Sequence, residues 1–571
     1  MYSNTFFQNF RQISVLIQKN YDYYKFGNGS GMAYLFALSA SSSKRDEGVG
    51  PFGESCLRIN WQEANQAKLQ LPISIIFIKK LLFIWHMEHN HLVKERIRKI
   101  EELRQKGINP FPYRFDRTHT TKQILDKFKL KKQERTKTKA KVAGRIMGLR
   151  RMGKVTFMHI QDGFGKLQLY FQQETTKDYK ILKKFDIGDF IGAEGIIFAT
   201  KTGEITVEVK NYAMLSKAIR PFPEKYHGLQ STELKYRKRY LDLLFNEKSR
   251  QTFVIRSKII TAMREFLEKR GFLEVETPTL QPIYGGAAAK PFTTMHNDLK
   301  MNLYLKISDE LYLKRLITGG FERVYEIDKD FRNESIDTTH NPEFTMMECY
   351  AAYMDYNDVM ELVEECYEYC AKKVLGTTKA KYGKHTIDFK KPWKRLSMID
   401  ALKKYAKLDV TKMTDRDLLK EIKKRKIELK HGEERGFLID ALFGELCEPN
   451  LIQPVFIIDH PKETTPLCKT HRKDSDLIER FEPFVAGFEI GNAYSELNDP
   501  QKQYELLKEQ SKLLKKGDEE MNPMDEDFIE AIEYGMPPMG GLGLGIDRMV
   551  MLFTDNQSIR DVILFPTMKP K

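Results

Sequence analysis

The sequence predicts an α+β protein in which an N-terminal OB-fold β-barrel precedes a larger domain built on an antiparallel sheet. Two observations predict this architecture. Between residues 140 and 215, apolar and polar residues alternate with the period of two that is typical of half-buried strands. Beyond residue 246, strand-like runs are joined by short turns rather than by helices, which favours an antiparallel sheet over a parallel one.

Composition limits the functional classes without selecting one. The chain has 571 residues, 41% of them hydrophobic, which is enough for two or three domains with cores of their own. Its 94 Lys and Arg against 79 Asp and Glu leave a net charge of +15. This charge suits a polyanionic partner, although a generally basic proteome would explain it equally well.

Cysteine usage and hydropathy indicate a reducing, non-membrane location. The six cysteines form no CxxC pair and no cluster at zinc spacing, so we expect reduced thiols in a cytoplasmic protein. The longest apolar stretch, Leu71–Trp85, is interrupted by two lysines and is shorter than the roughly 20 residues that a membrane span requires. No membrane association is expected.

Residues 1–86 differ from the rest because they show no sustained helical or strand period. Three alternatives exist: an organelle-targeting presequence, a disordered RNA-binding tail, and a start codon assigned too far upstream. A presequence should be rich in Arg and poor in acids, an RNA-binding arm should be dense in Lys, and the segment fits neither. We therefore expect translation to begin at Met87 and residues 1–86 to be dispensable and poorly ordered.

Residues 87–136 are predicted to be a helical segment, since apolar residues recur at helical spacing from Leu92 to Leu103 before Gly107 interrupts them. The barrel is predicted over residues 137–216, and another small β-barrel or an SH3-like unit is the alternative. Its strands are expected at Lys141–Leu149, Val155–Gln161, Lys166–Phe171, Asp189–Phe198 and Glu204–Leu215.

Alternation also predicts which side chains of the barrel face outward. If Met158 and Leu169 are core residues, Phe157 and Gln168 are exposed on one open face. An aromatic ring stacks on an unpaired base and an amide bonds to its edge, so this face suits single-stranded RNA.

Residues 217–245 are predicted to be a connector, and residues 246–571 a single large domain. The helices of this domain are expected at Arg256–Arg270, Ser308–Thr318, Tyr356–Leu375 and Asp499–Lys515.

A predicted hairpin within Phe321–Tyr353 gathers charged residues. On its first strand Arg332 and Glu334 should share a face, and on its second strand Phe344, Met346, Glu348 and Tyr350 should do the same. Unpaired buried charge makes a poor core. These residues are better suited to binding a ligand with an anionic and a cationic end.

A glycine-rich run, Gly540–Gly545, is interpreted as a loop that opens the helix-like run Met549–Phe553. Glycines let the backbone approach a phosphate, and Arg548 adds a guanidinium near the helix N-terminus. A close-packed turn is the alternative, and the P-loop pattern is absent.

Two glutamates, Glu482 and Glu489, could hold a magnesium ion (Mg2+) between themselves and phosphate oxygens, or could be solvent-facing acids on an edge strand. Asn492, Tyr494 and Glu496 share a face by parity, and Glu489 has the opposite parity. All four can meet one pocket only if a bulge lies at Gly491.

Taken together, these segments resemble the class II aminoacyl-tRNA synthetases. Gly271–Pro278 resembles motif 1 of that family, Phe331–Glu334 with His340–Thr345 resembles motif 2, and Gly543–Arg548 resembles motif 3. The similarity is closest to the lysine-specific members and covers the chain from about Leu92 onward. It implies an enzyme that uses ATP to convert L-lysine into lysyl-adenylate and pyrophosphate, and then transfers lysine to the 3'-terminal ribose of tRNA(Lys).

The resemblance also implies roles for individual residues. Arg332 would bind the α-phosphate of ATP together with the substrate carboxylate, and Arg548 would bind the γ-phosphate; with Glu334 they form the catalytic set. The implied ATP site contains Arg332, Glu334, His340, Asn341, Phe344, Glu482, Gly545 and Arg548. The implied lysine pocket contains Gly286, Glu310, Arg332, Glu348, Tyr350, Asn492, Tyr494 and Glu496. Magnesium would be carried by Glu482 and Glu489, and the anticodon would be read by Arg150, Phe157, Gln168 and Glu204. A homodimer formed through motif 1 is implied as well.

Physical reasoning supports the implied substrate. A lysine ammonium in a closed pocket requires fixed carboxylates, which Glu310, Glu348 and Glu496 would supply, whereas an aspartate pocket would require a cation. This argues against an aspartyl or asparaginyl enzyme with the same layout. A shortened paralogue that lysylates a protein would lack the barrel. A catalytically silent RNA-binding module would have no need of Arg332, Glu334 and Arg548.

Overall fold

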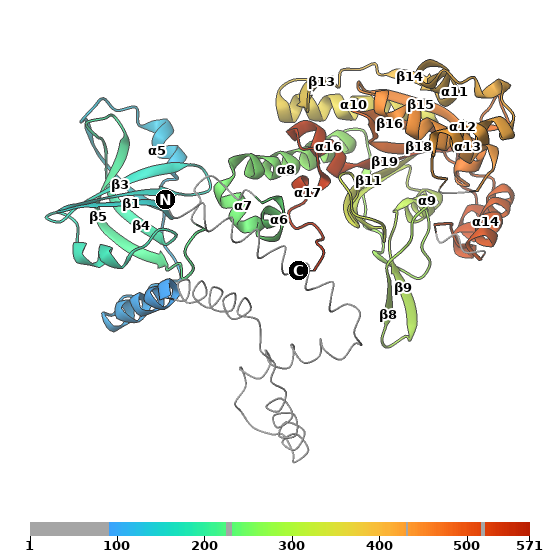
Figure 1. Cartoon of the computed structure of the whole chain (residues 1–571). Helices are drawn as coiled ribbons and strands as arrows, with labels where there is room; N and C mark the ends of the chain where they lie inside the picture. Colours follow the sequence, from blue (N-terminus) through green and yellow to red (C-terminus); the bar gives the residue numbers. More distant parts are fainter. Residues whose placement is uncertain (1–90, 224–230, 430–431, 516–519, 571) are drawn as a thin grey trace, which may run out of the picture. The chain divides into compact units, whose positions relative to one another are not determined.

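The computed structural model describes residues 91–223, 231–429, 432–515 and 520–570. The chain divides into two compact units, one ending at Glu224 and the other beginning at Lys225 (Figure 1). The expectations for residues 1–86, including a start at Met87, lie outside the described residues. Among the helices that the structure describes, none combines the length and the apolar character that crossing a membrane requires.

The strands of the first unit close a β-barrel in the order β1-β2-β3-β5-β4. Neighbouring strands are antiparallel except β3 and β5, which run parallel. This confirms the OB-fold expectation. Residues 91–105 form a helix ahead of the barrel. The remaining elements of the unit are α5 (Thr121–Lys127), β1 (Arg135–Met152), β2 (Val155–Gln161), β3 (Lys166–Gln172), the 3-10 helix η1 (Tyr179–Lys184), β4 (Phe190–Ala199) and β5 (Ile205–Ser216).

The barrel interior follows the expected alternation. Met158 on β2 pairs with Leu169 on β3, and both side chains are fully buried in the core of the unit. The first strand begins at Arg135 rather than at Lys141, because its early residues already pair with β4, where Lys139 lies opposite Ile196. Lysines on the solvent face of a strand do not interrupt its ladder.

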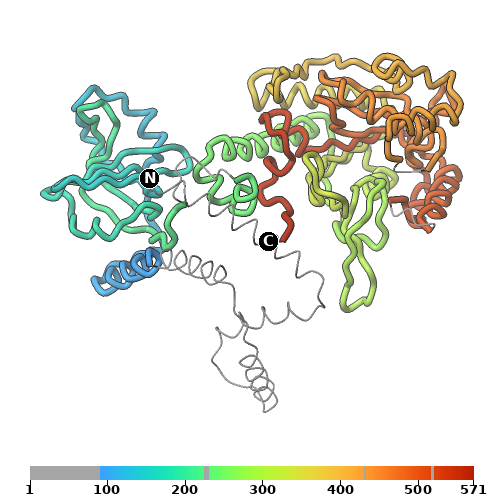
Figure 2. Tube along the Cα trace, viewed as in Figure 1, coloured from blue at the N-terminus to red at the C-terminus, as the bar shows by residue number. Residues whose placement is uncertain are grey.

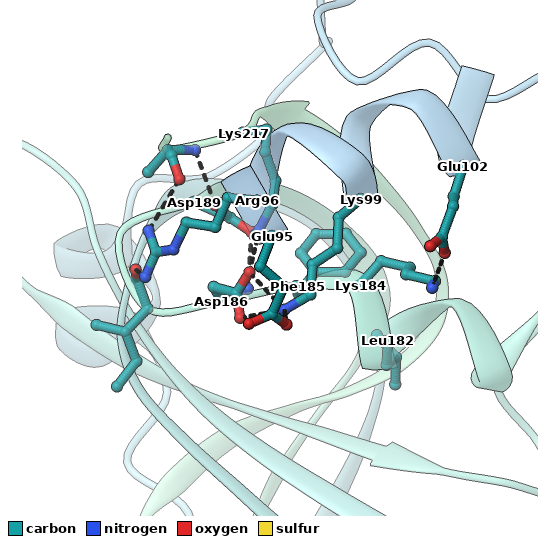
Figure 3. Close-up of polar contacts among 12 residues, drawn as sticks. Glu95, Arg96, Lys99, Glu102, Leu182, Lys184, Phe185, Asp186, Asp189 and Lys217 are labelled. Carbon is teal, nitrogen blue, oxygen red and sulfur yellow. Dashed lines mark hydrogen bonds and ion pairs between the residues drawn. The ribbon is translucent and has the colours of Figure 1, made fainter. Parts of the chain in front are cut away.

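A charged cluster attaches the helix of residues 91–105 to the barrel (Figure 3). At its centre, the fully buried Lys217 ammonium lies 2.5 Å from Asp186 Oδ2 and 2.7 Å from Asp189 Oδ2. The helix contributes Lys99, whose ammonium lies 2.9 Å from Asp186 Oδ1. Lys99 also lies 3.2 Å from the partly exposed Glu95 Oε1, and the two ammonium groups match the charges of the two more buried carboxylates, Asp186 and Asp189.

The second unit is built on a mixed, mainly antiparallel sheet. Its strand order over the described residues is β14-β15-β16-β18-β19-β11-β10-β6, and β17 pairs with β16. Only the β10–β6 and β14–β15 pairs run parallel. The strands of this sheet are β6 (Leu273–Glu274), β10 (Arg323–Phe331), β11 (Glu343–Ala352), β14 (Lys394–Ser397), β15 (Val455–Pro461), β16 (Leu477–Val485), β17 (Phe488–Glu489), β18 (Gly491–Ser495) and β19 (Met539–Gly545).

Smaller sheets and helices surround this sheet. The small sheets are formed by β7 (Leu280–Gln281), β8 (Thr293–His296) and β9 (Met301–Leu305), and by β12 (Lys379–Tyr382) and β13 (His385–Asp388). The α-helices are α6 (Thr232–Arg237), α7 (Arg239–Phe245), α8 (Glu247–Glu268), α9 (Glu310–Thr318), α10 (Tyr356–Leu375), α11 (Met398–Ala401), α12 (Asp415–Arg425), α13 (Arg435–Leu446), α14 (Pro500–Lys515), α15 (Glu526–Glu533), α16 (Ile546–Thr554) and α17 (Ile559–Val562). Short helical turns are η2 (Leu402–Ala406), η3 (Val410–Lys412), η4 (Glu448–Asn450) and η5 (Lys462–Thr464).

The two faces of the large sheet carry different cores. Helices α8, α10 and α16 cover one face (Figure 1), where Met347 and Cys349 of β11 join their apolar side chains. On the other face, Tyr350 packs in a smaller core with residues of α9 and α15. Glu348 lies on the same face of β11 as Tyr350, so the polar pocket forms on the side away from the large core.

Segments far apart in the sequence meet beside α7. The Arg239 guanidinium, almost completely buried, donates to the carbonyl oxygens of Arg560, Ile563 and Leu564 at 2.8–3.0 Å. Figure 2 shows the C-terminal stretch in red running next to the green segment that holds this helix. The second unit is thus closed by contacts between its first and last described elements.

The helix of residues Tyr356–Leu375 is as expected, but two sequence predictions about the site elements are wrong. The run Gly540–Gly545 lies in strand β19, not in a loop. Arg332 and Glu334 lie beyond β10, which ends at Phe331. The ladder ends there because the next partner on β11 is Pro342, which has no N–H to donate and only accepts from Arg332 N.

Candidate active site and nucleic-acid face

The floor of the candidate pocket is the glycine strand β19, which lies between β11 and β18. A Cβ atom on Gly541 would lie 1.9 Å from Glu496 Oε1 and 2.4 Å from the Tyr350 ring. A Cβ on Gly543 would contact the Glu348 side chain at 3.8 Å. Glycine in the middle of a sheet weakens the strand but leaves space above it. The glycines of β19 therefore leave room for side chains that come from both neighbouring strands.

One wall of the pocket is centred on Glu348 of β11. Its Oε1 accepts from Ser308 Oγ at 2.8 Å and from Asp309 N at 3.2 Å, and its Oε2 accepts from Tyr350 Oη at 3.0 Å. Burial, with Asp330 and Glu310 nearby, raises the pKa of Glu348 to about 8. This wall offers a buried carboxylate held in one orientation by neutral donors.

Gly286 closes the pocket beside this wall. It has a φ of +88°, and a Cβ there would lie 2.9 Å from Ser308 Oγ and 3.0 Å from Glu310 Cβ. The left-handed backbone and the lack of space both favour glycine at this position. Gly286 and Glu310, assigned together to the lysine pocket on the basis of sequence, lie side by side.

Glu310 of α9 and Glu496 also lie in this pocket, where they meet around Lys314. The Lys314 ammonium lies 2.5 Å from Glu310 Oε1 and 2.5 Å from Glu496 Oε2, and all three side chains are buried. Burial raises the pKa of Glu496 to about 8, although the ammonium opposes this shift. Sequence reasoning missed Lys314, whose spacing of four residues from Glu310 on a helix was the available signal.

Strand β18 supplies Asn492 and Tyr494 on the pocket face. Arg480 Nε donates to Asn492 Oδ1 at 3.0 Å, and Asn492 Nδ2 donates to Tyr494 Oη at 2.5 Å. The bulge that the parity argument required is present: Phe484 pairs with Glu489, but Phe481 pairs with Ala493, so the register shifts by one residue at the break between β17 and β18. This shift places Glu489 on the same side as the pocket residues.

The phosphate end of the candidate site contains Arg332 and Arg548. The Arg332 guanidinium lies 5.1 Å from the centre of the Phe344 ring, and its Nε donates to Ile307 O at 3.2 Å. Arg548, in the first turn of α16, donates to Glu489 O at 2.7 Å and Glu489 Oε2 at 3.0 Å. Two guanidinium groups held in this way could each bind a phosphate oxygen.

The loop between β10 and β11 supplies the other residues assigned to ATP. His340 Nε2 lies 3.3 Å from Arg548 Nη2, and Asn341, almost completely buried, donates to Glu343 O at 2.6 Å. Glu334 is exposed on this loop, and Gly545 ends β19 immediately before α16. The structure therefore brings His340 to Arg548 and leaves Glu334 at the surface.

Glu482 and Glu489 suit a divalent cation in their chemistry. Burial, with the Arg480 guanidinium opposing it and the Glu489 carboxylate adding to it, raises the pKa of Glu482 to about 8. Both residues offer carboxylate oxygens, the ligand type that Mg2+ prefers. A bound cation would reduce the repulsion between the two carboxylates. No cluster of three or more His, Cys, Asp and Glu residues suited to a metal occurs in the part of the chain that the structure describes.

A second buried lysine, which sequence reasoning also missed, lies next to the residues of the pocket. The Lys306 ammonium lies 2.7 Å from Asp309 Oδ1, 3.0 Å from Glu326 Oε1 and 2.9 Å from Asp328 Oδ2. Glu326 also accepts from the backbone N–H and the hydroxyl of Thr277. Lys306 thus links the segment that resembles motif 1 to the strand that precedes the Arg332 loop.

The barrel presents an aromatic face on β2, β3 and β4. The Phe157 ring lies 5.1 Å from the Tyr170 ring, which lies 5.9 Å from the Phe198 ring. Arg150 is exposed directly opposite Phe157 on the neighbouring strand. Aromatic rings beside an exposed guanidinium form a surface on which unpaired bases can stack.

The expectation that Gln168 is exposed is wrong. Its side chain is buried: Nε2 donates to Glu204 Oε2 at 2.8 Å, and Oε1 accepts from Thr206 Oγ1 at 3.0 Å. Glu204 Oε1 in turn lies 3.1 Å from His159 Nε2. The parallel neighbour β5 covers Gln168, which strand alternation alone does not reveal. Contact between this amide and a base would require an exchange of hydrogen-bond partners.

Comparison with known proteins agrees with this geometry. Residues 231–569 match the family described as tRNA synthetases class II (D, K and N), and residues 140–215 match the OB-fold nucleic acid binding domain. Among similar relatives are proteins named lysine–tRNA ligase from Carboxydothermus hydrogenoformans (51% identical, over 85% of this chain and 99% of the relative) and Clostridium novyi (52% identical, over 85% and 95%). Another, from Clostridium tetani, is 49% identical over 86% of this chain and 99% of its own length.

Proposed function

The chain belongs to the lysine–tRNA ligases within the class II aminoacyl-tRNA synthetases, and from this we propose that its pocket binds L-lysine for attachment to tRNA(Lys). It is an ATP-dependent ligase: it activates lysine and transfers it to the 3'-terminal ribose of the tRNA, for protein synthesis. The observation that carries this proposal is the convergence of Glu310, Glu348 and Glu496 over a glycine floor. Buried carboxylates in excess of the nearby cations suit a ligand that brings ammonium groups.

We assign the groups of the reaction as follows. Glu310 beside Gly286 holds the α-ammonium of lysine, and Glu348, Tyr350 and Glu496, with Asn492 and Tyr494, enclose the side-chain ammonium. Arg332 binds the lysine carboxylate together with the α-phosphate. A carboxylate oxygen attacks the α-phosphorus, a new P–O bond forms, and the bond to the β-phosphate oxygen breaks with release of pyrophosphate. The protein accelerates this step by positioning and by neutralising charge.

We assign ATP to the face of the Phe344 ring, with Arg548 at the γ-phosphate. The other residues assigned around the nucleotide are His340, Asn341, Glu334 and Gly545. Glu482 and Glu489 would hold Mg2+, which when bound neutralises phosphate charge. The barrel face of Arg150, Phe157, Gln168 and Glu204 is assigned to the anticodon. The net charge of +15 supports the phosphate-dominated part of tRNA affinity.

Amino-acid-dependent exchange of pyrophosphate into ATP tests the substrate directly. We expect exchange with L-lysine and none with L-aspartate, L-asparagine or any other standard amino acid. Exchange that depends on a different amino acid would overturn the assignment of the pocket.

A homodimer through the segment Gly271–Pro278 and a cytoplasmic location complete the proposal. The free, buried cysteines among the described residues support a reducing compartment. Sedimentation of the purified protein at micromolar concentration should give the mass of two chains, and an active monomer would contradict the dimer.

A further inference from the structure

Lys314 has a position in the pocket that the proposed reaction does not explain. It lies on α9, is fully buried, and its ammonium is shared between Glu310 and Glu496, each 2.5 Å away. Both carboxylates are assigned to the substrate. The Tyr350 ring lies 5.9 Å from the same nitrogen, and Cys468 pairs with Glu496 on its other side. The Lys314 ammonium therefore neutralises part of the carboxylate charge that is assigned to the ammonium groups of lysine.

Charge counting gives this arrangement a purpose. Lysine brings two ammonium groups and one carboxylate, and Arg332 brings one positive charge. The three glutamates bring three negative charges when ionised, so without Lys314 these groups together would have one negative charge in excess. With Lys314 their charges sum to zero, and the buried Asp330 beside Glu348 contributes equally with and without Lys314. Because an uncompensated buried charge is costly, the state with neutral charge should be strongly preferred.

We infer that Lys314 is a positioning and specificity-determining residue that sets the charge of the pocket, so that it matches a ligand of net charge +1. This inference rests on the proposed function. It requires no contact between Lys314 and substrate, because the residue acts through Glu310 and Glu496. A ligand with the same side chain but a different net charge should be rejected by the wild-type pocket and favoured when the Lys314 charge is removed.

L-Lysinamide provides this ligand, because the amide removes the carboxylate and leaves a net charge of +2 below about pH 7, where its α-amino group is protonated and where the assay is run. In wild-type protein, L-lysinamide should inhibit pyrophosphate exchange only weakly. In Lys314→Met the lysine KM should rise on the order of 100-fold, whereas the inhibition constant of L-lysinamide should change by less than about tenfold. The ratio of the two constants therefore shifts toward the amide, and the KM for ATP stays the same.

Two further variants separate charge from packing. Lys314→Arg keeps the charge and should keep the wild-type ratio. Lys314→Gln removes the charge but keeps a hydrogen-bond donor, and it should shift the ratio as Lys314→Met does. It therefore provides the same test if Lys314→Met folds poorly. The matched control is Lys217→Met, which removes a buried lysine between two carboxylates in the barrel unit. It should leave the ratio unchanged.

The inference is overturned if lysine and L-lysinamide weaken by the same factor in both neutral variants, because this is the result of a purely structural role. It is also overturned if Lys314→Arg shifts the ratio. Failure of the proposed function is distinguishable, since the wild-type protein would then show no lysine-dependent exchange at all.

Discussion

Both units of the chain bury lysine ammonium groups among carboxylates, but with opposite charge balance. In the barrel unit, Lys217 and Lys99 face Asp186 and Asp189, so the charges are matched within the protein. In the catalytic unit, Lys314 faces Glu310 and Glu496, and Glu348 has only neutral donors. The first arrangement is complete without a ligand and the second is not. Surplus buried carboxylate charge therefore accompanies the proposed binding site, although it is not confined to it, because Lys306 also faces three carboxylates.

The pKa values of the carboxylates reflect this difference. Burial acts to raise the pKa of Asp186, but hydrogen bonds from Lys217 and Lys99 bring it below its usual value. Glu348 and Glu496 are buried as well, and their pKa values rise to about 8. Burial also raises the pKa of Asp189, against the effect of the Lys217 ammonium, so only Asp186 departs from the pocket carboxylates in direction. At neutral pH the pocket retains protons that a cationic ligand can displace.

The largest expected effect is on the pocket. Glu348→Gln removes a buried carboxylate that forms no ion pair within the protein, so lysine binding should weaken by about 3–5 kcal/mol, the cost of breaking a buried pair. Thermal stability of the empty protein at neutral pH should change little, because Glu348 with its pKa of about 8 is already largely protonated there and glutamine is also uncharged. Pyrophosphate exchange at varied lysine and ATP concentrations measures this effect. An unchanged lysine KM would place the specificity pocket elsewhere.

The second prediction concerns the barrel unit, where a buried cation is removed instead of a carboxylate. Lys217→Met leaves Asp189 without a cation and should destabilise the barrel unit by about 3 kcal/mol. Pyrophosphate exchange needs no tRNA and should stay at the wild-type level below the unfolding transition. Thermal unfolding followed by circular dichroism, with exchange assayed in parallel, tests whether the barrel cluster is structural. A lysine KM that rises in this variant would remove the distinction between the two clusters.

A smaller effect is expected on the aromatic face of the barrel. Phe157→Ala should cost roughly 1–3 kcal/mol in tRNA binding, because one base-stacking contact is lost. The KM for tRNA in aminoacylation should rise while pyrophosphate exchange stays constant. If exchange falls as much as charging, the aromatic face is structural.

The smallest effect is the pH dependence of lysine binding. Below pH 8 the raised pKa values of Glu348 and Glu496 mean that lysine displaces protons, so the lysine KM should fall between pH 6 and pH 8 by at most about tenfold per unit for each proton released. The folded empty protein binds these protons more tightly than the unfolded chain, so their contribution to stability is greatest below pH 4.5 and is lost as pH rises to 8. Added lysine should therefore raise the melting temperature more at pH 8 than at pH 6. A lysine KM that is independent of pH in this range would contradict the protonated pocket.

Much of the fold follows from local sequence, whereas the details of the site depend on tertiary contacts. Residues Val155–Gln161 form a strand as their alternation predicts, and Tyr356–Leu375 form a helix that begins at an Asp355 cap. In the sequence alone, the glycines of β19 are typical of a loop. The structure gives another reason for glycine there, because side chains from the neighbouring strands β11 and β18 fill the space above the strand.

The sequence also does not reveal which groups contact the side chains of the candidate sites. Alternation cannot show that β5 covers Gln168, and the sequence does not indicate that Lys314 reaches Glu496, which is far along the chain and lies on a different element. Motif resemblance indicated the residues of the candidate site. Only the packing of separate elements reveals which of their charges are matched by the protein itself.

The position of β19 in the large sheet also determines the order in which the protein can be built during translation. The strands of the barrel lie close together in the sequence, so this unit can fold as soon as β5 has been synthesised. In the large sheet, β19 must insert between β11 and β18, yet it begins at Met539 and β11 ends at Ala352. At typical elongation rates the β11 edge waits roughly 10–40 s for its partner. During that interval the nascent sheet exposes an unpaired edge, which is open to pairing with other chains.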